Sequence, residues 1–206
     1  MNFDNQALEW DNDPTKTERA KVVAKEIIDY IKPDNTLTAL EFGCGTGLLS
    51  FQLKDVFKSI TLADNSEGMI KILKDKIVKA GVKNFIPLHI DSLNGELKTN
   101  EYDVVYTLMS LHHIPDVKNI LMVFNSILKG GGYLCIADLV KEDGSFHSDH
   151  DDFDGHNGFD KNELNEILTS NGFNVEYYKI CYEIVKTIDD NEKKYPLFLM
   201  ISKKVT

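Results

Sequence analysis

Three glycines at alternating positions, Gly43, Gly45 and Gly47, mark a turn at which the backbone itself could hold a ligand. A glycine can adopt a positive φ angle, and because it lacks a Cβ atom it lets another molecule approach the main chain closely. The apolar run 38–42 before the glycines is typical of a short buried strand, and the pattern from 48 onwards begins a helix. The structural alternative is a glycine turn that only packs a helix on a strand.

A second candidate for ligand chemistry is Asp64, which ends the apolar stretch 59–64. It lies about 20 residues after Gly43, the interval at which nucleotide-binding α/β folds place a carboxylate on ribose hydroxyls. An ionised carboxylate only accepts hydrogen bonds, so it can take one from each of two vicinal hydroxyls. An aspartate here could instead cap the next helix, a role that Asn65 or Ser66 can also fill.

Histidines form the third candidate group, because the pair His112 and His113 follows the apolar stretch 103–109 and His156 lies further on. Imidazole titrates nearest neutral pH, so each is a candidate general base for an acceptor oxygen or nitrogen that must lose a proton. Adjacent histidines also occur in metal sites. Neighbouring side chains project differently, however, and the sequence offers no matching ligand set, so we predict no metal at this pair.

The stretch 41–47, an acidic residue followed by G-x-G-x-G, resembles motif I of the class I S-adenosylmethionine-dependent methyltransferases, of the small-molecule type 11/12-like kind. The competing dinucleotide fingerprint G-x-G-x-x-G needs its third glycine at position 48, which is Leu48. The resemblance covers roughly 36–203. It implies S-adenosylmethionine as the cofactor and methyl transfer to an unidentified acceptor that is a small molecule.

The resemblance also assigns roles to single residues. Glu41 and the backbone of 43–47 hold the methionine portion of the cofactor, Asp64 holds the ribose and Asp91 accepts from the adenine amino group. Met69 packs on the adenine ring, with a place in the core as its alternative. The complete set of expected cofactor residues is Glu41, Gly43, Cys44, Gly45, Gly47, Asp64, Asn65, Met69, Asp91, Ser92, Leu93, Thr107 and Leu108.

Two flanking segments are expected to border the substrate. In methyltransferases of this type an amino-terminal extension commonly lies over the cofactor cleft, which puts Trp10 and Asp11 on the substrate side; alternatively, Trp10 closes the edge of the core. The acidic stretch 139–160, which carries several histidines, has three open interpretations: a solvated mobile loop, a substrate lid with a functional histidine, or a metal site.

Alternating strand and helix patterns predict an α/β fold, a Rossmann-like three-layer sandwich whose seven-stranded, mostly parallel sheet ends in an antiparallel hairpin. Pro87 predicts an edge strand, and the run Gly130–Gly132 predicts a helix stop and turn. We expect a single methyltransferase domain, 1–206, with a helical extension over 1–35 and the core over 36–206. The expected strands are 38–42, 59–64, 85–90, 103–109, 133–138, 172–184 and 196–201, and the expected helices begin near 15, 48, 67, 117 and 161.

The amino-acid composition limits the kinds of molecule that this protein is expected to bind. Of 206 residues, 42% are hydrophobic, and 23 basic against 33 acidic residues give a net charge of −10, which disfavours nucleic acid as a substrate. The stretch 1–5 lacks the pattern of a leader and we find no membrane span, so we expect a soluble, cytoplasmic protein, either a monomer or a homodimer. Three scattered cysteines, Cys44, Cys135 and Cys181, are expected to be reduced thiols.

Two other functions stay open at this point. An NAD-dependent oxidoreductase could use Asp64 on its ribose, although the position of the third glycine opposes it. A non-catalytic, methyltransferase-like binding module is also compatible, because the sequence contains no residue that defines a substrate.

Overall fold

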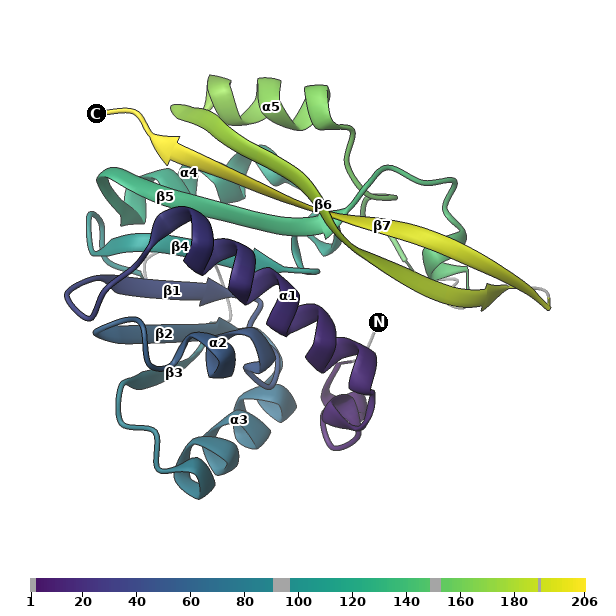
Figure 1. Ribbon diagram of the computed structural model, residues 1–206, viewed down its shortest axis with the longest axis horizontal. Helices are drawn as coiled ribbons and strands as arrows, with labels where there is room; N and C mark the ends of the chain where they lie inside the picture. Colours follow the sequence, from purple (N-terminus) through teal and green to yellow (C-terminus); the bar gives the residue numbers. More distant parts are fainter. Residues whose placement is uncertain (1–2, 91–96, 149–152, 189) are drawn as a thin grey trace.

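A single mixed sheet of seven strands runs through the protein, whose computed structural model describes residues 3–90, 97–148, 153–188 and 190–206. The strand order is β3-β2-β1-β4-β5-β7-β6, and Figure 1 shows the strands side by side across the view with α1 crossing in front of them. The strands are β1 (Thr38–Phe42), β2 (Ser59–Asp64), β3 (Phe85–His89), β4 (Tyr102–Leu108), β5 (Leu128–Leu139), β6 (Phe173–Ile188) and β7 (Asn191–Lys204).

Five α-helices and four short 3-10 turns connect these strands in the described part of the chain. The helices are α1 (Pro14–Ile31), α2 (Leu48–Leu53), α3 (Glu67–Ala80), α4 (Val117–Ile127) and α5 (Lys161–Ser170). The 3-10 turns are η1 (Asp4–Gln6), η2 (Trp10–Asn12), η3 (Leu111–His113) and η4 (Ser145–His147).

The strand pairing confirms the predicted fold class. β3, β2, β1, β4 and β5 pair in parallel, whereas β7 pairs antiparallel with both β5 and β6. The chain builds outwards from β1 to β3 and then returns to place β4 on the other side of β1, so the order reverses between β1 and β4. Open α/β sheets bind their ligands outside the carboxyl ends of the strands at such a reversal.

Apolar side chains on both faces of the sheet form two cores and explain the three layers. One core joins the sheet to α1, α2 and α3, and the other joins it to α4 and α5. Phe124 of α4 and Leu168 of α5 are fully buried in the second core, as Ile27 of α1 is in the first. Pro87 lies in β3, which is an edge strand of the sheet, as predicted.

The run Gly130–Gly132 corrects the predicted helix stop. α4 ends at Ile127, and the three glycines lie inside β5, which begins five residues earlier in the chain than Tyr133, the first residue of the expected strand. The pairing shifts register here, and a Cβ atom on Gly132 would lie 2.9 Å from the carbonyl oxygen of Asp103. The glycines therefore allow a close approach between neighbouring strands.

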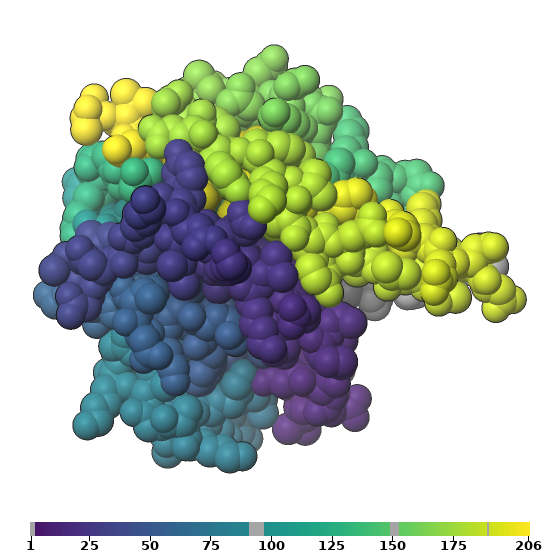
Figure 2. Space-filling model, in the orientation of Figure 1, coloured from purple at the N-terminus to yellow at the C-terminus, as the bar shows by residue number. Residues whose placement is uncertain are grey.

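The terminal hairpin is longer than the sequence predicted. β6 continues to Ile188 and β7 begins at Asn191, whereas the expected strands ended at 184 and began at 196. The hairpin projects from the body of the protein as an arm, which Figure 2 shows in yellow and green. Lys186 and Lys193 of the hairpin bond to the segment 141–148. These contacts help charged residues to remain in paired strands here.

Candidate functional site

The glycine turn after β1 has the backbone that glycine requires. Gly43, Gly45 and Gly47 have φ angles of 66°, 51° and 81°. A Cβ atom on Gly43 would overlap the side chain of Ser110, and one on Gly47 would lie 2.8 Å from Leu73. Gly45 is the least crowded of the three, because the nearest atoms to its Cβ position, from Trp10 and Met69, lie at 3.7 and 3.9 Å. A side chain there would be in ordinary contact and not in overlap.

Asp64, at the end of β2, ties the glycine turn to the next loop. One carboxylate oxygen accepts from the Gly45 amide at 2.7 Å, and the other accepts from the Ser66 amide at 2.9 Å. Burial raises the pKa of Asp64 above its ordinary value. Ser66 fills the capping role at α3, since its hydroxyl accepts from the Met69 amide. Each oxygen of Asp64 keeps a further lone pair for another donor.

Glu41 lies beneath the turn. Its carboxylate is 2% exposed and accepts from both the amide and the hydroxyl of Ser50, and the Ser50 hydroxyl lies 2.7 Å from that of Tyr106. Burial raises the pKa of Glu41 to about 8, against an opposing effect of the Ser50 hydrogen bonds. Glu41 therefore anchors the start of α2 to the sheet.

The amino-terminal turns cover the glycine turn. Asp11 of η2 accepts from the Thr46 hydroxyl and pairs with Lys76 of α3. Trp10 places its indole nitrogen over Gly45, at 3.7 Å from the Cβ position, with the ammonium of Lys16 at 3.6 Å from the centroid of its ring. Figure 1 shows this segment near the carboxyl ends of β1 and β2.

A second contact holds the same segment against α3. Asp4 accepts from the Ser66 hydroxyl at 2.6 Å and from the Gly68 amide at 2.8 Å. These bonds lower the pKa of Asp4, with the Ser66 hydroxyl as the largest cause. Residues 3–13 are thereby held at the loops that follow β1 and β2.

The loop after β4 closes the other side of the turn. The Ser110 hydroxyl donates to the Gly43 carbonyl oxygen at 3.0 Å, which joins the ends of β1 and β4. Met109 between them has a positive φ of 55°. Thr107 is buried at the end of β4, and its hydroxyl has no hydrogen-bond partner among the described residues. Leu108 is half-buried beside it.

His112 forms a buried pair with Asp138, the penultimate residue of β5. The Nδ1 atom of His112 lies 2.6 Å from the Asp138 carboxylate, and both side chains are at most 1% exposed. Burial acts to raise the pKa of Asp138, but His112 and the backbone bonds outweigh it and hold that pKa below its ordinary value. An ionised carboxylate only accepts, so Nδ1 carries the proton and donates it.

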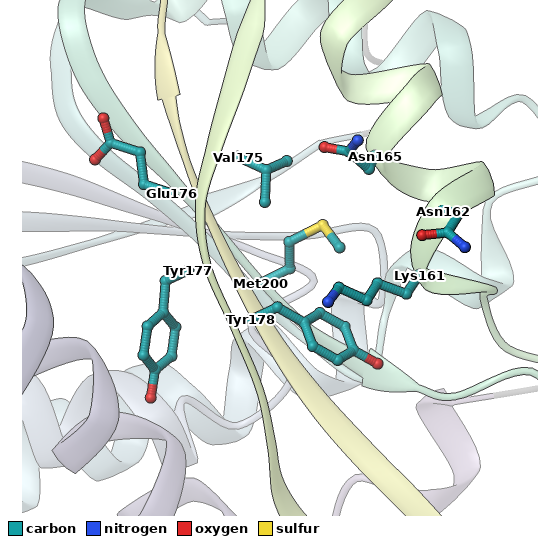
Figure 3. Close-up of a pocket in the computed structure, with 8 residues that line it drawn as sticks. All are labelled: Lys161, Asn162, Asn165, Val175, Glu176, Tyr177, Tyr178 and Met200. Carbon is teal, nitrogen blue, oxygen red and sulfur yellow. The ribbon is translucent and has the colours of Figure 1, made fainter.

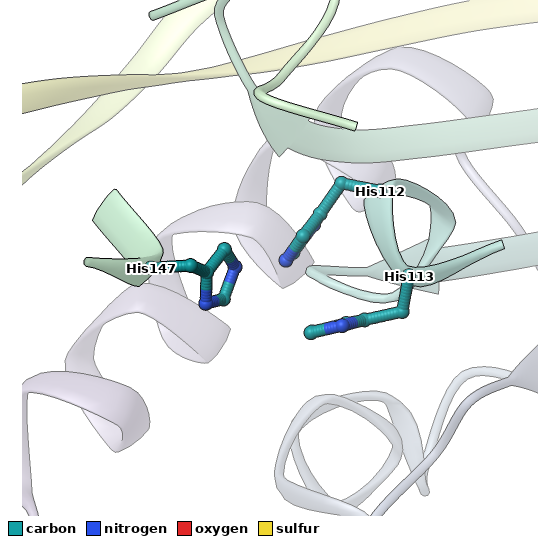
Figure 4. A group of neighbouring side chains, drawn as sticks. All are labelled: His112, His113 and His147. Carbon is teal, nitrogen blue, oxygen red and sulfur yellow. The ribbon is translucent and has the colours of Figure 1, made fainter. Parts of the chain in front are cut away.

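His113 and His147 lie against the ring of His112 (Figure 4). The ring centroids of His112 and His113 are 4.1 Å apart, and those of His147 lie 5.1 Å from His112 and 5.2 Å from His113. Burial, with the other two imidazoles nearby, lowers the pKa of His113 to about 3, so its ring is neutral. A functional histidine was one interpretation of the stretch 139–160, but no local pattern indicates that His147 joins this pair.

The hairpin arm positions His147. Lys193 of β7 pairs with Asp143 in a salt bridge, and the Tyr195 hydroxyl lies 2.7 Å from that of Ser145. Lys186 of β6 donates to the Phe146 carbonyl oxygen at 2.5 Å. The segment 141–148 is therefore fixed to the arm.

His156 lies apart from this cluster. Its Nε2 atom is 3.0 Å from the Ile114 carbonyl oxygen, and because a carbonyl only accepts, Nε2 is the donor. Its backbone amide donates to the His112 carbonyl oxygen at 2.7 Å. His156 thus fastens its loop to η3, and its ring nitrogen is engaged there.

Several expected cofactor residues remain to be placed. Cys44 is buried, with its thiol 3.5 Å from the Gly45 carbonyl oxygen. Asn65 is exposed, and its carbonyl oxygen lies 3.1 Å from a ring nitrogen of His89. Met69 is buried, with its sulfur 3.9 Å from the Cβ position of Gly45. The remaining three, Asp91, Ser92 and Leu93, lie outside the described residues.

Two residues of the site were not singled out in the sequence. Asp138 ends a parallel strand beside β4, so the rule that ligands bind at strand carboxyl ends could have identified it. No local signal identifies His147, because the arm that places it comes from the last strands of the chain. A separate hollow between α5 and β6 is lined by residues such as Lys161, Tyr178 and Met200 and contains none of these histidines or carboxylates (Figure 3).

Residues 40–136 match the family model described as a methyltransferase domain. The chain is 33% identical over 118 residues to an uncharacterized methyltransferase of Schizosaccharomyces pombe, which covers 54% of this chain and 42% of that protein. It is 26% identical over 179 residues to an O-methyltransferase of Pyrenophora dematioidea, and this alignment covers 81% of this chain and 66% of that protein. A Haloferax volcanii chain solved in complex with the Trm112 methyltransferase activator has the same fold, with a TM-score of 0.79 over 99% of this chain and 98% of that one at 18% identity.

Together with the sheet order and the glycine turn, these matches support the resemblance of the stretch 41–47 to the class I S-adenosylmethionine-dependent methyltransferase superfamily. S-adenosylmethionine is the cofactor of that superfamily. The chain spans about half the length of the curated relatives it matches. Within the described residues, no helix combines the length and the apolar character that a membrane crossing needs.

Proposed function

We propose that this protein binds S-adenosylmethionine outside the carboxyl ends of β1, β2 and β4 and transfers its methyl group to a hydroxyl group of a small molecule. The cofactor supplies an activated methyl on its sulfonium, so the chain must bind, orient and deprotonate the acceptor. The O-methyltransferase of Pyrenophora dematioidea supports oxygen as the acceptor atom.

The described residues suit the cofactor in charge and shape. We assign the methionine portion to the glycine turn, where Gly45 is the least crowded position, and two ribose hydroxyls to the spare lone pairs of Asp64. The sulfur of Met69, beside Gly45, offers an apolar contact for the adenine ring. The backbone groups of Thr107 and Leu108 end β4 on the opposite side. Asp91 is proposed for the adenine amino group from its sequence position alone.

Glu41 has a different role from the one first expected of it. Its carboxylate is occupied by Ser50 below the turn, so we propose that it supports the methionine site by fixing the Gly45 loop. Trp10 and Asp11 cover the same loop from above and would exclude water from the reacting groups. This arrangement supports one domain whose first 35 residues form an extension over the cofactor.

The buried pair of His112 and Asp138 is the observation that carries the proposal. With Nδ1 donating to Asp138, neutral His112 presents the lone pair of Nε2, which is buried and has no hydrogen-bond partner among the described residues. The acceptor hydroxyl passes its proton to this nitrogen as its oxygen bonds to the methyl carbon. The carbon–sulfur bond breaks at the same time, and S-adenosylhomocysteine leaves.

The charge of the protein supports a small acceptor. A net charge of −10 opposes binding to nucleic acid, since phosphate recognition requires basic side chains. We propose a small-molecule substrate without nucleic acid or membrane partners, a cytoplasmic location, and a monomer or homodimer.

The test is turnover on a panel of small molecules that carry hydroxyl groups, measured as the amount of S-adenosylhomocysteine formed. The wild-type chain is compared with His112→Gln and Asp138→Asn. We expect kcat to fall about 100- to 10,000-fold in His112→Gln, the usual contribution of a general base, while cofactor affinity stays within a few-fold. His89→Gln, which changes a histidine on β3, should leave kcat unchanged. Undiminished turnover of His112→Gln at saturating acceptor would contradict this role of His112.

A further inference from the structure

The three imidazoles of His112, His113 and His147 converge from two separate turns, η3 and η4. One nitrogen of each lies within 4.8 Å of the corresponding nitrogens of the other two. Figure 4 shows the three rings gathered around one small space, with His147 reaching in from the opposite side. Two of the three residues are buried and His113 is half-buried, so the group is not a solvated patch.

His112 is already held in the orientation that a metal ligand needs. Asp138 accepts a hydrogen bond from Nδ1–H, so Nε2 is the nitrogen left for a ligand bond, and metal-ligating histidines commonly donate their other N–H to a carboxylate in this way. That Nε2 atom is buried without a hydrogen-bond partner among the described residues. A buried polar atom without a partner destabilises the folded protein, and a bound ligand would remove that cost.

The surroundings favour an ion held away from water. Phe153 stacks on His147 with ring centroids 4.0 Å apart, and Phe3 lies edge-on to His113 at 5.3 Å. An apolar shell of this kind strengthens electrostatic interactions within it. The Asp138 carboxylate beneath His112 supplies negative charge that balances part of the charge of a cation.

We propose that His112, His113 and His147 bind one divalent transition-metal ion of the zinc class, with Asp138 orienting His112 from behind. Imidazole nitrogen suits Zn²⁺, Co²⁺, Ni²⁺ and Cu²⁺, whereas Mg²⁺ and Ca²⁺ require oxygen ligands. Tetrahedral Zn–N bonds of about 2.0–2.1 Å place ligand nitrogens about 3.3 Å apart, so the rings rotate slightly inwards on binding.

Three protein ligands leave a fourth position open, which is the pattern of catalytic zinc. The consequence for catalysis rests on the proposed function, although ion binding itself does not. With the ion bound, the Nε2 lone pair of His112 would be engaged and could not also take the acceptor proton. The ion would then replace His112 as the group that activates the acceptor hydroxyl, by lowering the pKa of that hydroxyl.

The experiment is titration of the full chain, first freed of metal with a chelator, with Co²⁺ and then Zn²⁺ in the absence of cofactor and acceptor. We expect one equivalent of Co²⁺ to give the visible absorption of a tetrahedral site, and Zn²⁺ to displace it. His147→Ala should weaken binding more than about 100-fold and Asp138→Asn about 10- to 100-fold. His89→Ala is the matched control and should bind like the wild type.

A wild-type protein that gives neither the cobalt band nor a zinc binding heat would overturn the proposal, and so would wild-type affinity in His147→Ala. His147 packs on Phe153, so its replacement could disturb the fold, and the circular dichroism spectrum of each variant is compared with that of the wild type. His113→Gln, at a half-buried position, provides a second test and should lose metal affinity to the same extent. Binding of S-adenosylhomocysteine is measured separately in the same samples. Cofactor binding without metal binding would refute the ion alone, whereas metal binding without cofactor binding would refute the proposed function.

Discussion

The substitution Glu41→Gln should remove a large pH dependence from the stability of the protein. Glu41 is 2% exposed, and burial raises its pKa from 4.5 to about 8 in the folded state. Between these two pH values the folded protein keeps a proton that the unfolded chain has lost. Stability therefore falls as the pH rises from about 4.5 to about 8, because the unfolded state binds fewer protons over that window.

The size of the effect follows from the two pKa values. One pH unit of separation corresponds to about 1.36 kcal/mol, and the fraction of the shift that develops between pH 5 and pH 8 amounts to about 3.5 kcal/mol. Glutamine has the shape of the protonated acid and can still accept from the Ser50 amide, but it does not titrate. The variant should lose this part of the pH dependence and be more stable than the wild type at pH 8.

Urea unfolding at pH 5, 6.5 and 8 measures the effect as a difference between wild type and variant, so titration of all other groups cancels. Glu166→Gln, an exposed position on α5, serves as the control and should follow the wild type at each pH. A difference between Glu41→Gln and wild type that changes by less than about 1 kcal/mol from pH 5 to pH 8 would refute the reasoning. It would mean that Glu41 is ionised in the folded protein and that its charge is compensated.

Three further outcomes are expected. Phe124→Ala should lower the free energy of unfolding by about 3–5 kcal/mol, because this fully buried ring leaves a cavity in the core between the sheet and α4; urea unfolding at pH 7 measures it. Asp160→Ala should cost about 1 kcal/mol in the same assay, since it removes the carboxylate that accepts from the Asn162 and Glu163 amides at the start of α5. Trp10 is the only tryptophan and lies over the glycine turn, so S-adenosylhomocysteine should change its fluorescence emission, and an unchanged spectrum at saturation would contradict that placement.

Local sequence patterns predicted most of the strands and turns that form the proposed cofactor site. The glycine turn, the strand that ends at Asp64 and the edge strand with Pro87 each depend on residue types within a few positions, and the fold follows from their order. The run Gly130–Gly132 was misread, because glycine is as suitable for a close strand approach as for a turn, and only the neighbouring Asp103 decides between them.

The histidine cluster could not be predicted in the same way. His112 and His147 are brought together by contacts that are distant in sequence, namely the pairing of β4 with β5 and the salt bridge from Lys193 to Asp143. The role of Glu41 shows a similar limit of local motifs. Its position in the motif indicated a ligand contact, whereas Ser50 at the start of the next helix determines where its carboxylate lies.

Calorimetric titration with S-adenosylmethionine and S-adenosylhomocysteine tests the central claim most directly, with NAD as the control ligand. We expect tight binding of both sulfur ligands and no binding of NAD. Asp64→Asn should weaken both affinities about 10- to 100-fold, because a charged acceptor for the ribose hydroxyls is lost, whereas the exposed control Asp75→Asn should not. Absence of binding by either sulfur ligand, or unchanged affinity in Asp64→Asn, would contradict the proposed cofactor site.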